Sequence, residues 1–201
     1  MAGAGFDEVV ARRRMVRSFD GRPVDDEVLA RVLATAGRAP SAGNSQGLDL
    51  VVLRGDETER YWSVTFPDPA GRARFRWQGL LRAPVLVVVV TDPQAYVARY
   101  AEADKAATGL GGGPDAWAVP YWWVDAGMGI EHVLLAAVAE GLGACFFGLF
   151  DHEEAVLRAL GVPPGRRAVG TVALGHPVPD GPGRSVQRPR RPNLHWTGWS
   201  R

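Results

Sequence analysis

The sequence is poor in cysteine and in lysine. Cys145 stands alone, which excludes an intrachain disulfide framework and a zinc site built on cysteines. Of 23 basic residues only Lys105 is a lysine, so nearly all positive groups are guanidiniums, which suit bidentate contacts to phosphate. Codon bias in a GC-rich genome explains that preference equally well. The formal net charge of +1 provides no overall field that would favour nucleic acid as a partner.

Long apolar runs are also absent. The longest, residues 84–90, is too short to cross a bilayer, and the apolar stretch 126–149 is interrupted by Glu131, His132 and Glu140. The first residues lack the basic-then-apolar order of a secretory signal. We therefore expect a soluble protein of the reducing cytoplasm with no membrane partner.

The composition favours one globular domain. A chain of 201 residues with 46% hydrophobic and 22% charged residues can bury one sizeable core, so we expect a single domain over 1–201. From residue 178 the chain is rich in proline and arginine and has little periodicity, which predicts an extended arm over 178–201. Such an arm suggests a second subunit.

Apolar periodicity predicts helices interspersed with strands. We expect helices over 24–36, near Glu57 and Ala70, over 93–103 and 123–142, and from a cap at Asp151 to about Leu160. Strands are expected over 48–53, 85–91, 144–149 and 168–174, with 85–91 in the centre of the sheet, and 108–120 as a mobile surface loop. The order predicts an α+β fold with a central mixed or antiparallel sheet of about four to five strands flanked by helices.

Three segments have the composition of a binding site. In RRRMVRSF, Arg13 and Arg17 lie four residues apart and would share a face if the backbone there were helical, so that they could clasp a phosphate; an exposed basic helix end is the alternative. In APSAGNSQ, residues 39–46, small residues beside polar ones suit a planar ligand or an ordinary loop. In GLGACFFG, residues 141–148, glycines interrupt an apolar segment. Its backbone amides could face a ligand, or its side chains could simply pack in the core.

Together these segments resemble the nitroreductase family. RRMVRSF is similar to its opening RRSVRxF, APSAGNSQG to its APSaxNxQPW, and DAGMGIEHVLLAAVAEGLGACFFG to its interface helix and the strand that faces the flavin. GVPPGRRAVGTVALGHP resembles the family's final strand and RRPNLHW its RRPL segment. The matches follow the family's order from Arg12 to Trp199, which makes them more specific than any single motif.

The resemblance implies a nitroreductase-like fold and an FMN site shared between two subunits, with the carboxy-terminal arm exchanged across a homodimer. The family pattern places four groups of residues around the cofactor. The ribityl and phosphate end would be held by Arg13, Arg14, Met15, Arg17, Arg190 and Arg191. Pro40, Ser41 and Asn44 would come from the other subunit, Arg76 or Gln78 would reach the pyrimidine edge, and Cys145, Phe146, Phe147 and Gly148 would cover one face of the ring.

Three positions depart from the family pattern. Met15 replaces a serine and loses a hydroxyl contact to the flavin. Gly47 replaces a proline, and Phe147 stands where some members have a glutamate, so both reshape the pocket. Substrate preference therefore does not transfer with the resemblance.

Other candidate residues have weaker signals. Tyr121, Trp122 and Trp123 could line a substrate entrance and stack on aromatic acceptors, or could pack at an interface. The four histidines show no spacing typical of metal ligands, so we expect no metal site, and Cys145 is expected to be a packing residue.

The implied activity is a hydride transfer from NAD(P)H through FMN to a small aromatic or quinone-like acceptor. The sequence contains no GxGxxG after a strand and no GKS or GKT, so NAD(P)H would bind only transiently over the flavin. Flavin fragmentation, reductive dehalogenation and substrate dehydrogenation on the same fold are alternatives. A non-catalytic scaffold that binds nucleic acid or a partner through the arginines of its tail, Arg184 to Arg191, is a further alternative, which the net charge of +1 disfavours.

Overall fold

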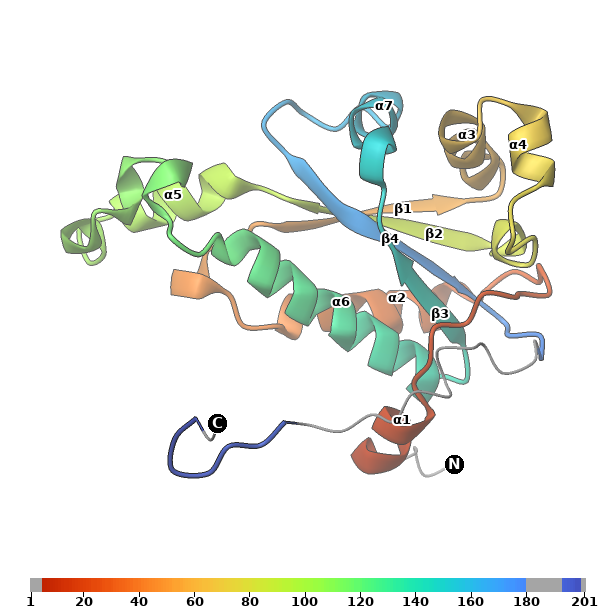
Figure 1. Cartoon of the computed structure of the whole chain (residues 1–201), viewed down its shortest axis with the longest axis horizontal. Helices are drawn as coiled ribbons and strands as arrows, with labels where there is room; N and C mark the ends of the chain where they lie inside the picture. The colour runs from red at the N-terminus through yellow and green to blue at the C-terminus, as the bar shows by residue number, and fades with distance from the viewer. Residues whose placement is uncertain (1–4, 180–192, 200–201) are drawn as a thin grey trace.

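Four antiparallel strands form the centre of the molecule (Figure 1). The computed structural model describes residues 5–179 and 193–199. The strands are β1 (Leu48–Arg54), β2 (Val85–Thr91), β3 (Gly143–Phe147) and β4 (Arg167–Gly175), in the spatial order β1-β2-β4-β3. Every neighbouring pair is antiparallel, and all seven residues of β2 are buried. The predicted sheet and its central strand are thus confirmed.

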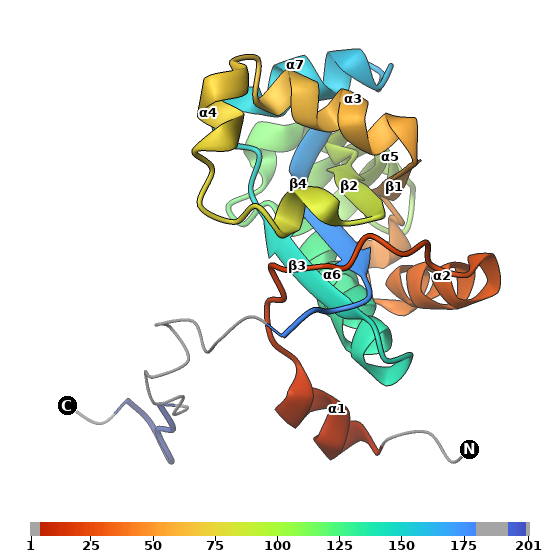
Figure 2. The ribbon, with the colours of Figure 1, turned by 90° about the vertical axis from the view of Figure 1, so that its right-hand side faces the viewer.

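Helices cover both faces of this sheet (Figures 1 and 2). On one face lie α2 (Asp26–Ala34) and α6 (Tyr121–Ala139), and on the other lie α3 (Asp56–Thr65), α4 (Pro69–Ala73) and α7 (Glu153–Ala159). At one end of the sheet is α5 (Pro93–Ala101), while α1 (Phe6–Arg12) lies against α6. Short 3₁₀ turns span Thr35–Arg38, Ala42–Asn44, Leu80–Arg82, Ala106–Thr108, Leu110–Gly112, Pro114–Ala116 and Phe150–His152.

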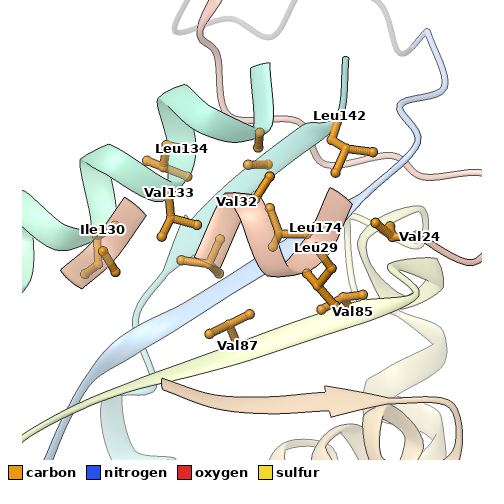
Figure 3. Packing of buried hydrophobic residues seen from close by; sticks show 14 of the residues in the cluster. Val24, Leu29, Val32, Val85, Val87, Ile130, Val133, Leu134, Leu142 and Leu174 are labelled. Carbon is orange, nitrogen blue, oxygen red and sulfur yellow. The ribbon is translucent and has the colours of Figure 1, made fainter. Parts of the chain in front are cut away.

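The sheet separates two apolar cores. Figure 3 shows the first, where Val32 of α2 and Val133 of α6 pack against Val87 and Leu174 of the sheet. The second lies beneath α3 and α7 and includes Val88. Because successive residues of a strand face opposite sides, the unbroken VLVVVVT run supplies both cores.

Local sequence explains where several elements begin. The Asp25 side chain caps α2 by accepting hydrogen bonds from the Glu27 and Val28 amides.

Between α5 and α6, residues 108–120 are mostly exposed, as predicted, but Trp117 is buried and donates from Nε1 to the Leu110 carbonyl. No helix in the described part of the chain is both long enough and apolar enough to cross a membrane.

The prediction that Asp151 caps α7 was wrong. The helix begins at Glu153, and Asp151 lies in the 3₁₀ turn Phe150–His152 that precedes it. A residue whose side chain caps a helix usually has an extended backbone. His152, which precedes α7, already has helical backbone angles, and no side chain caps this helix. The Glu153 carboxylate instead binds Arg167 and the Ala168 amide of β4.

The buried strand predicts a clear difference between two Val→Ala substitutions. Val88 on β2 is 0% exposed and Val52 on β1 is 39% exposed. We expect Val88→Ala to lower the free energy of unfolding by about 2 kcal/mol, and Val52→Ala by less than about 0.5 kcal/mol, because only the first leaves a cavity. Urea denaturation measures both values, and equal losses would contradict the packing described.

Candidate functional site

The arginine-rich segment lies against the outer edge of β3. The Val16 amide donates to the Ala144 carbonyl over 2.8 Å, and Met15 and Ala144 form a parallel bridge. Arg13 and Arg17 do not share a helical face, because α1 (Phe6–Arg12) ends before them and Arg13 has φ −58° and ψ 124°. Tertiary pairing with β3 holds this segment extended in place of a helix.

These arginines carry more positive charge than their surroundings neutralise. Arg13 Nε lies 3.3 Å from Glu131 Oε1. The Arg17 guanidinium lies 5.3 Å from the ring centroid of Trp77 and donates to the Met15 carbonyl, while Arg14 is exposed. In residues 5–179 and 193–199 neither Arg14 nor Arg17 forms an ion pair with a carboxylate. The segment therefore suits an anionic ligand.

The side chains of β3 alternate between the two cores. Cys145 is buried, while Phe146 and Phe147 are half-buried. A Cβ at Gly170 would lie 2.5 Å from the Phe146 ring, so a glycine is needed there on β4. Phe147 stacks on Trp62 of α3, with ring centroids 6.0 Å apart. Beyond the strand, Gly148 lies beneath the exposed ring of Phe150, whose φ of +49° is unusual for a bulky residue.

One backbone amide at the β3 edge has only a weak acceptor. The Phe146 N–H donates to the thioether sulfur of Met15 over 3.4 Å. A thioether accepts a hydrogen bond weakly, so a stronger acceptor on a ligand could replace it. The methionine that departs from the family pattern thus lies beside a backbone donor of the strand expected to cover the flavin.

The loop 39–46 lies in a different part of the subunit. It packs against α5 and the amino-terminal end of α6 (Figure 1). Pro40 and Asn44 are exposed and Ser41 is half-buried. Within the described residues, no hydrogen bond or ion pair joins this loop to 13–17 or to 143–148. One subunit therefore does not bring the two groups of predicted site residues together.

Arg76 and Gln78 have distinct surroundings. Gln78 Nε2 donates to the carbonyls of Arg72, Ala73 and Phe75, so this side chain stabilises the turn after α4. Arg76 is exposed and its guanidinium lies 5.5 Å from the centroid of Trp77. Its role at a ligand stays a prediction. Arg190 and Arg191 lie outside the described residues.

The three aromatic side chains at the start of α6 lie in different surroundings. Trp122 is buried and packs edge-on against Tyr96 and Trp117. Trp123 is half-buried beneath the Arg167 guanidinium, whereas Tyr121 is 43% exposed. Tyr121 is thus the member of this group most accessible to a substrate.

A row of aromatic rings links Phe147 to the arginine segment, and sequence reasoning did not find it. The row continues from Trp62 through Phe66 and Phe75 to Trp77, each ring within 6.1 Å of the next. No local pattern in the sequence marks it, because its members come from α3, the turn after α4 and β3. The Trp62 indole nitrogen is buried and lacks a hydrogen-bond partner in the described structure.

One side of α6 is only partly covered by the described residues, 5–179 and 193–199. Val124, Met128, Glu131, Leu135 and Val138 recur at intervals of three or four residues, which places them on one side of the helix. Val124 is 42% exposed, and Met128, Leu135 and Val138 are half-buried. An apolar stripe of this kind is typical of a helix that packs against another surface.

Comparison with known proteins places the chain in a family. The model of the nitroreductase family matches residues 10–176. This chain belongs to the nitroreductase family. It is 32% identical over 194 residues to the 5,6-dimethylbenzimidazole synthase of Rhodospirillum rubrum, covering 88% of this chain and 86% of that protein. It is 31% identical over 201 residues to the 4-nitrobenzoate reductase of Nocardioides sp., covering 85% and 80%.

A solved structure confirms the nitroreductase fold. The FMN complex of a protein described as a nitroreductase from Desulfovibrio desulfuricans superposes with a TM-score of 0.69 at 24% identity. The alignment covers 94% of this chain and 93% of that one. The expected family and fold are thus confirmed, while the exchange of the carboxy-terminal arm stays a prediction.

The surroundings of Cys145 predict low thiol reactivity. Burial raises the pKa of the Cys145 thiol, although the nearby Arg17 opposes the shift. Since the thiolate is the reactive form, we expect Ellman's reagent to label the folded protein at pH 8 at least about a hundredfold more slowly than the urea-unfolded protein. Equal rates in both states would contradict the buried position of Cys145.

Proposed function

We propose that this chain is an FMN-dependent oxidoreductase that passes a hydride from NAD(P)H to a small aromatic or quinone-like acceptor. The observation that carries the proposal is the pairing of residues 13–17 with the outer edge of β3. It puts guanidinium groups next to an apolar strand with a weakly bonded backbone amide. An anionic phosphate and a planar ring need such neighbours.

The donors of the arginine segment fit the phosphate end of FMN. A phosphate dianion that leaves water needs several fixed cations or amides. Arg13, Arg14 and Arg17 would supply them, and of these only Arg13 has a carboxylate partner in the described structure. Arg190 and Arg191 would add charge from the arm, as the resemblance implies.

The β3 edge fits the ring of the flavin. When bound, FMN supplies the acceptance and donation of the hydride. Cys145, Phe146, Phe147 and Gly148 would orient the ring, and the Phe146 amide would donate to it once released from Met15. The rings of Phe147 and Trp62 exclude water from this end of the site.

A second subunit completes the proposed site. The partly covered stripe of α6 supplies an apolar contact surface, and the loop 39–46 lies away from the arginine segment of its own subunit. A twofold dimer through α6 would let Pro40, Ser41 and Asn44 of one subunit reach the flavin of the other. We expect this homodimer in the cytoplasm.

The similarity to a 5,6-dimethylbenzimidazole synthase supports flavin breakdown as a second candidate. The two reactions differ in their product. A reductase would consume NAD(P)H steadily without oxygen when a quinone or nitroaromatic compound is added. A flavin destructase would convert reduced FMN to 5,6-dimethylbenzimidazole in air, which mass spectrometry detects. Formation of that product with no acceptor-dependent NAD(P)H consumption would replace the first proposal by the second.

Arg17→Ala tests the phosphate end of the site. Loss of a charge-assisted hydrogen bond should raise the Kd for FMN by about tenfold to a hundredfold and leave the Kd for riboflavin, which has no phosphate, unchanged. Isothermal titration measures both constants. Arg158→Ala, which removes an exposed ion pair with Glu154, is the control. An equal loss of riboflavin binding would show that Arg17 does not act on the phosphate.

Val124→Arg tests the dimer. A buried, unpaired guanidinium on the α6 stripe should weaken dimerisation by about two orders of magnitude, because the charge must be desolvated. Sedimentation equilibrium measures the constant. Val52→Arg is the matched control, since Val52 is 39% exposed and lies on β1. A Val124→Arg protein that sediments like the unsubstituted protein would place the interface elsewhere.

A further inference from the structure

Asp125 is a buried carboxylate in the mainly apolar helix α6. Only 4% of the surface of Asp125 is exposed. Oδ2 accepts a hydrogen bond from the Ala42 amide over 2.7 Å and from the Tyr96 hydroxyl over 2.9 Å. In the described residues no arginine, lysine or histidine forms an ion pair with it. Burying such a group is costly, and a neutral helix residue would avoid the cost.

The carboxylate holds a loop with an unusual backbone. Gly43, Asn44 and Gln46 have φ values of +61°, +57° and +51°. Non-glycine residues rarely adopt this left-handed region, and glutamine has less preference for it than asparagine. Such a conformation persists only where the surroundings fix it. The Ala42 amide that binds Asp125 is the donor just before this strained stretch.

Other contacts fix the middle and the end of the loop. Arg99 Nε donates to the Gly43 carbonyl over 2.8 Å, and Thr91 Oγ1 donates to the Gly47 carbonyl over 3.0 Å. A Cβ at Gly47 would lie 2.7 Å from the Tyr96 ring and 2.9 Å from the Asp92 carbonyl. The glycine that stands in place of the family's proline therefore makes room for Tyr96.

Tyr96 acts together with Asp125 in holding the loop 41–46. Burial, together with the bond to Asp125, holds the pKa of the Tyr96 hydroxyl well above its ordinary value. The hydroxyl thus stays protonated and donates to the carboxylate. Its ring also packs against Trp117 and Trp122, which fixes the position of the donor.

The supported loop presents polar groups at the surface. Asn44 is exposed, and its Oδ1 accepts from Gln46 Nε2 over 2.9 Å. This leaves Asn44 Nδ2 without an acceptor in the part of the chain that the structure describes. Ser41 Oγ accepts from the Gln46 amide and keeps its own proton for a further bond. The loop has the donors that a flavin ring with several acceptors needs.

We propose that Asp125 is a positioning residue for flavin binding, acting with Tyr96 to hold residues 41–46 in the shape that presents Ser41 and Asn44 to FMN. This inference rests on the proposed function. Asp125 itself does not touch the cofactor in this account, and its effect passes through the Ala42 amide.

The test compares Tyr96→Phe and Asp125→Asn with a matched control, Tyr61→Phe. Tyr61 is also buried and its hydroxyl binds Thr171 Oγ1 over 2.9 Å, beneath α3 and away from the loop. Tyr96→Phe removes one oxygen and keeps the ring, so it should fold even if Asp125→Asn does not. For each protein we would measure the Kd for FMN, the thermal midpoint, and hydrogen exchange of residues 41–46 without ligand.

We expect both loop variants to exchange faster over residues 41–46 and to bind FMN at least about tenfold more weakly. Tyr61→Phe should lower the thermal midpoint by a similar amount and change neither exchange in the loop nor the Kd. If the variants bound FMN within about twofold of the unsubstituted protein, or if Tyr61→Phe weakened FMN equally, the positioning role would be wrong. If the unsubstituted protein bound no FMN, the proposed function itself would fail.

Discussion

The pairing of the amino-terminal segment with β3 is the constraint on which the site depends. An edge strand leaves a row of unpaired amides and carbonyls, which must be satisfied by another segment or by water. Here the Val16 amide donates a hydrogen bond to the Ala144 carbonyl, and the Met15 sulfur accepts one from the Phe146 amide. The same pairing carries the adjacent arginines to the strand. A structural need of the sheet thus places cations beside an apolar surface.

The long helix α6 connects the parts of the site. Its inward residues complete the core under the sheet, as Figure 3 shows for Ile130 and Val133. Near its amino terminus Asp125 holds the loop 41–46, and further along Glu131 lies beside Arg13. The remaining side is mainly apolar and only partly covered by the described residues. In the proposed dimer, one helix therefore supports the loop of its own subunit while its partly covered side forms the interface.

Strong local patterns made much of the fold predictable. The unbroken run in β2 and the apolar circumference of α6 depend only on near neighbours in sequence, and both elements formed as expected. The sequence left the backbone around Arg13 open, because what holds it extended is the pairing with β3, about 130 residues away in sequence. The Asp151 cap failed because a 3₁₀ turn leads directly into α7.

Contacts between distant residues could not be predicted from the sequence. Asp125 meets Ala42 across 83 residues of chain, and nothing near either residue marks the pair. The one available signal was a carboxylate in a helix that is apolar on most of its circumference, because such a group must face solvent or find donors. Motif order identified the family, whereas the role of each site residue depends on the proposed ligand and the proposed dimer, which no local pattern in the sequence specifies.

The most direct test of the central claim is the visible absorption spectrum of the purified protein with FMN, recorded without oxygen before and after addition of NADPH or NADH. We expect a bound-flavin spectrum that bleaches when the nucleotide is added, because residues 13–17 and the β3 edge would hold the flavin where a hydride donor can reach it. Failure to retain FMN would contradict the assignment of that edge as a flavin site. It would favour a scaffold without catalytic activity.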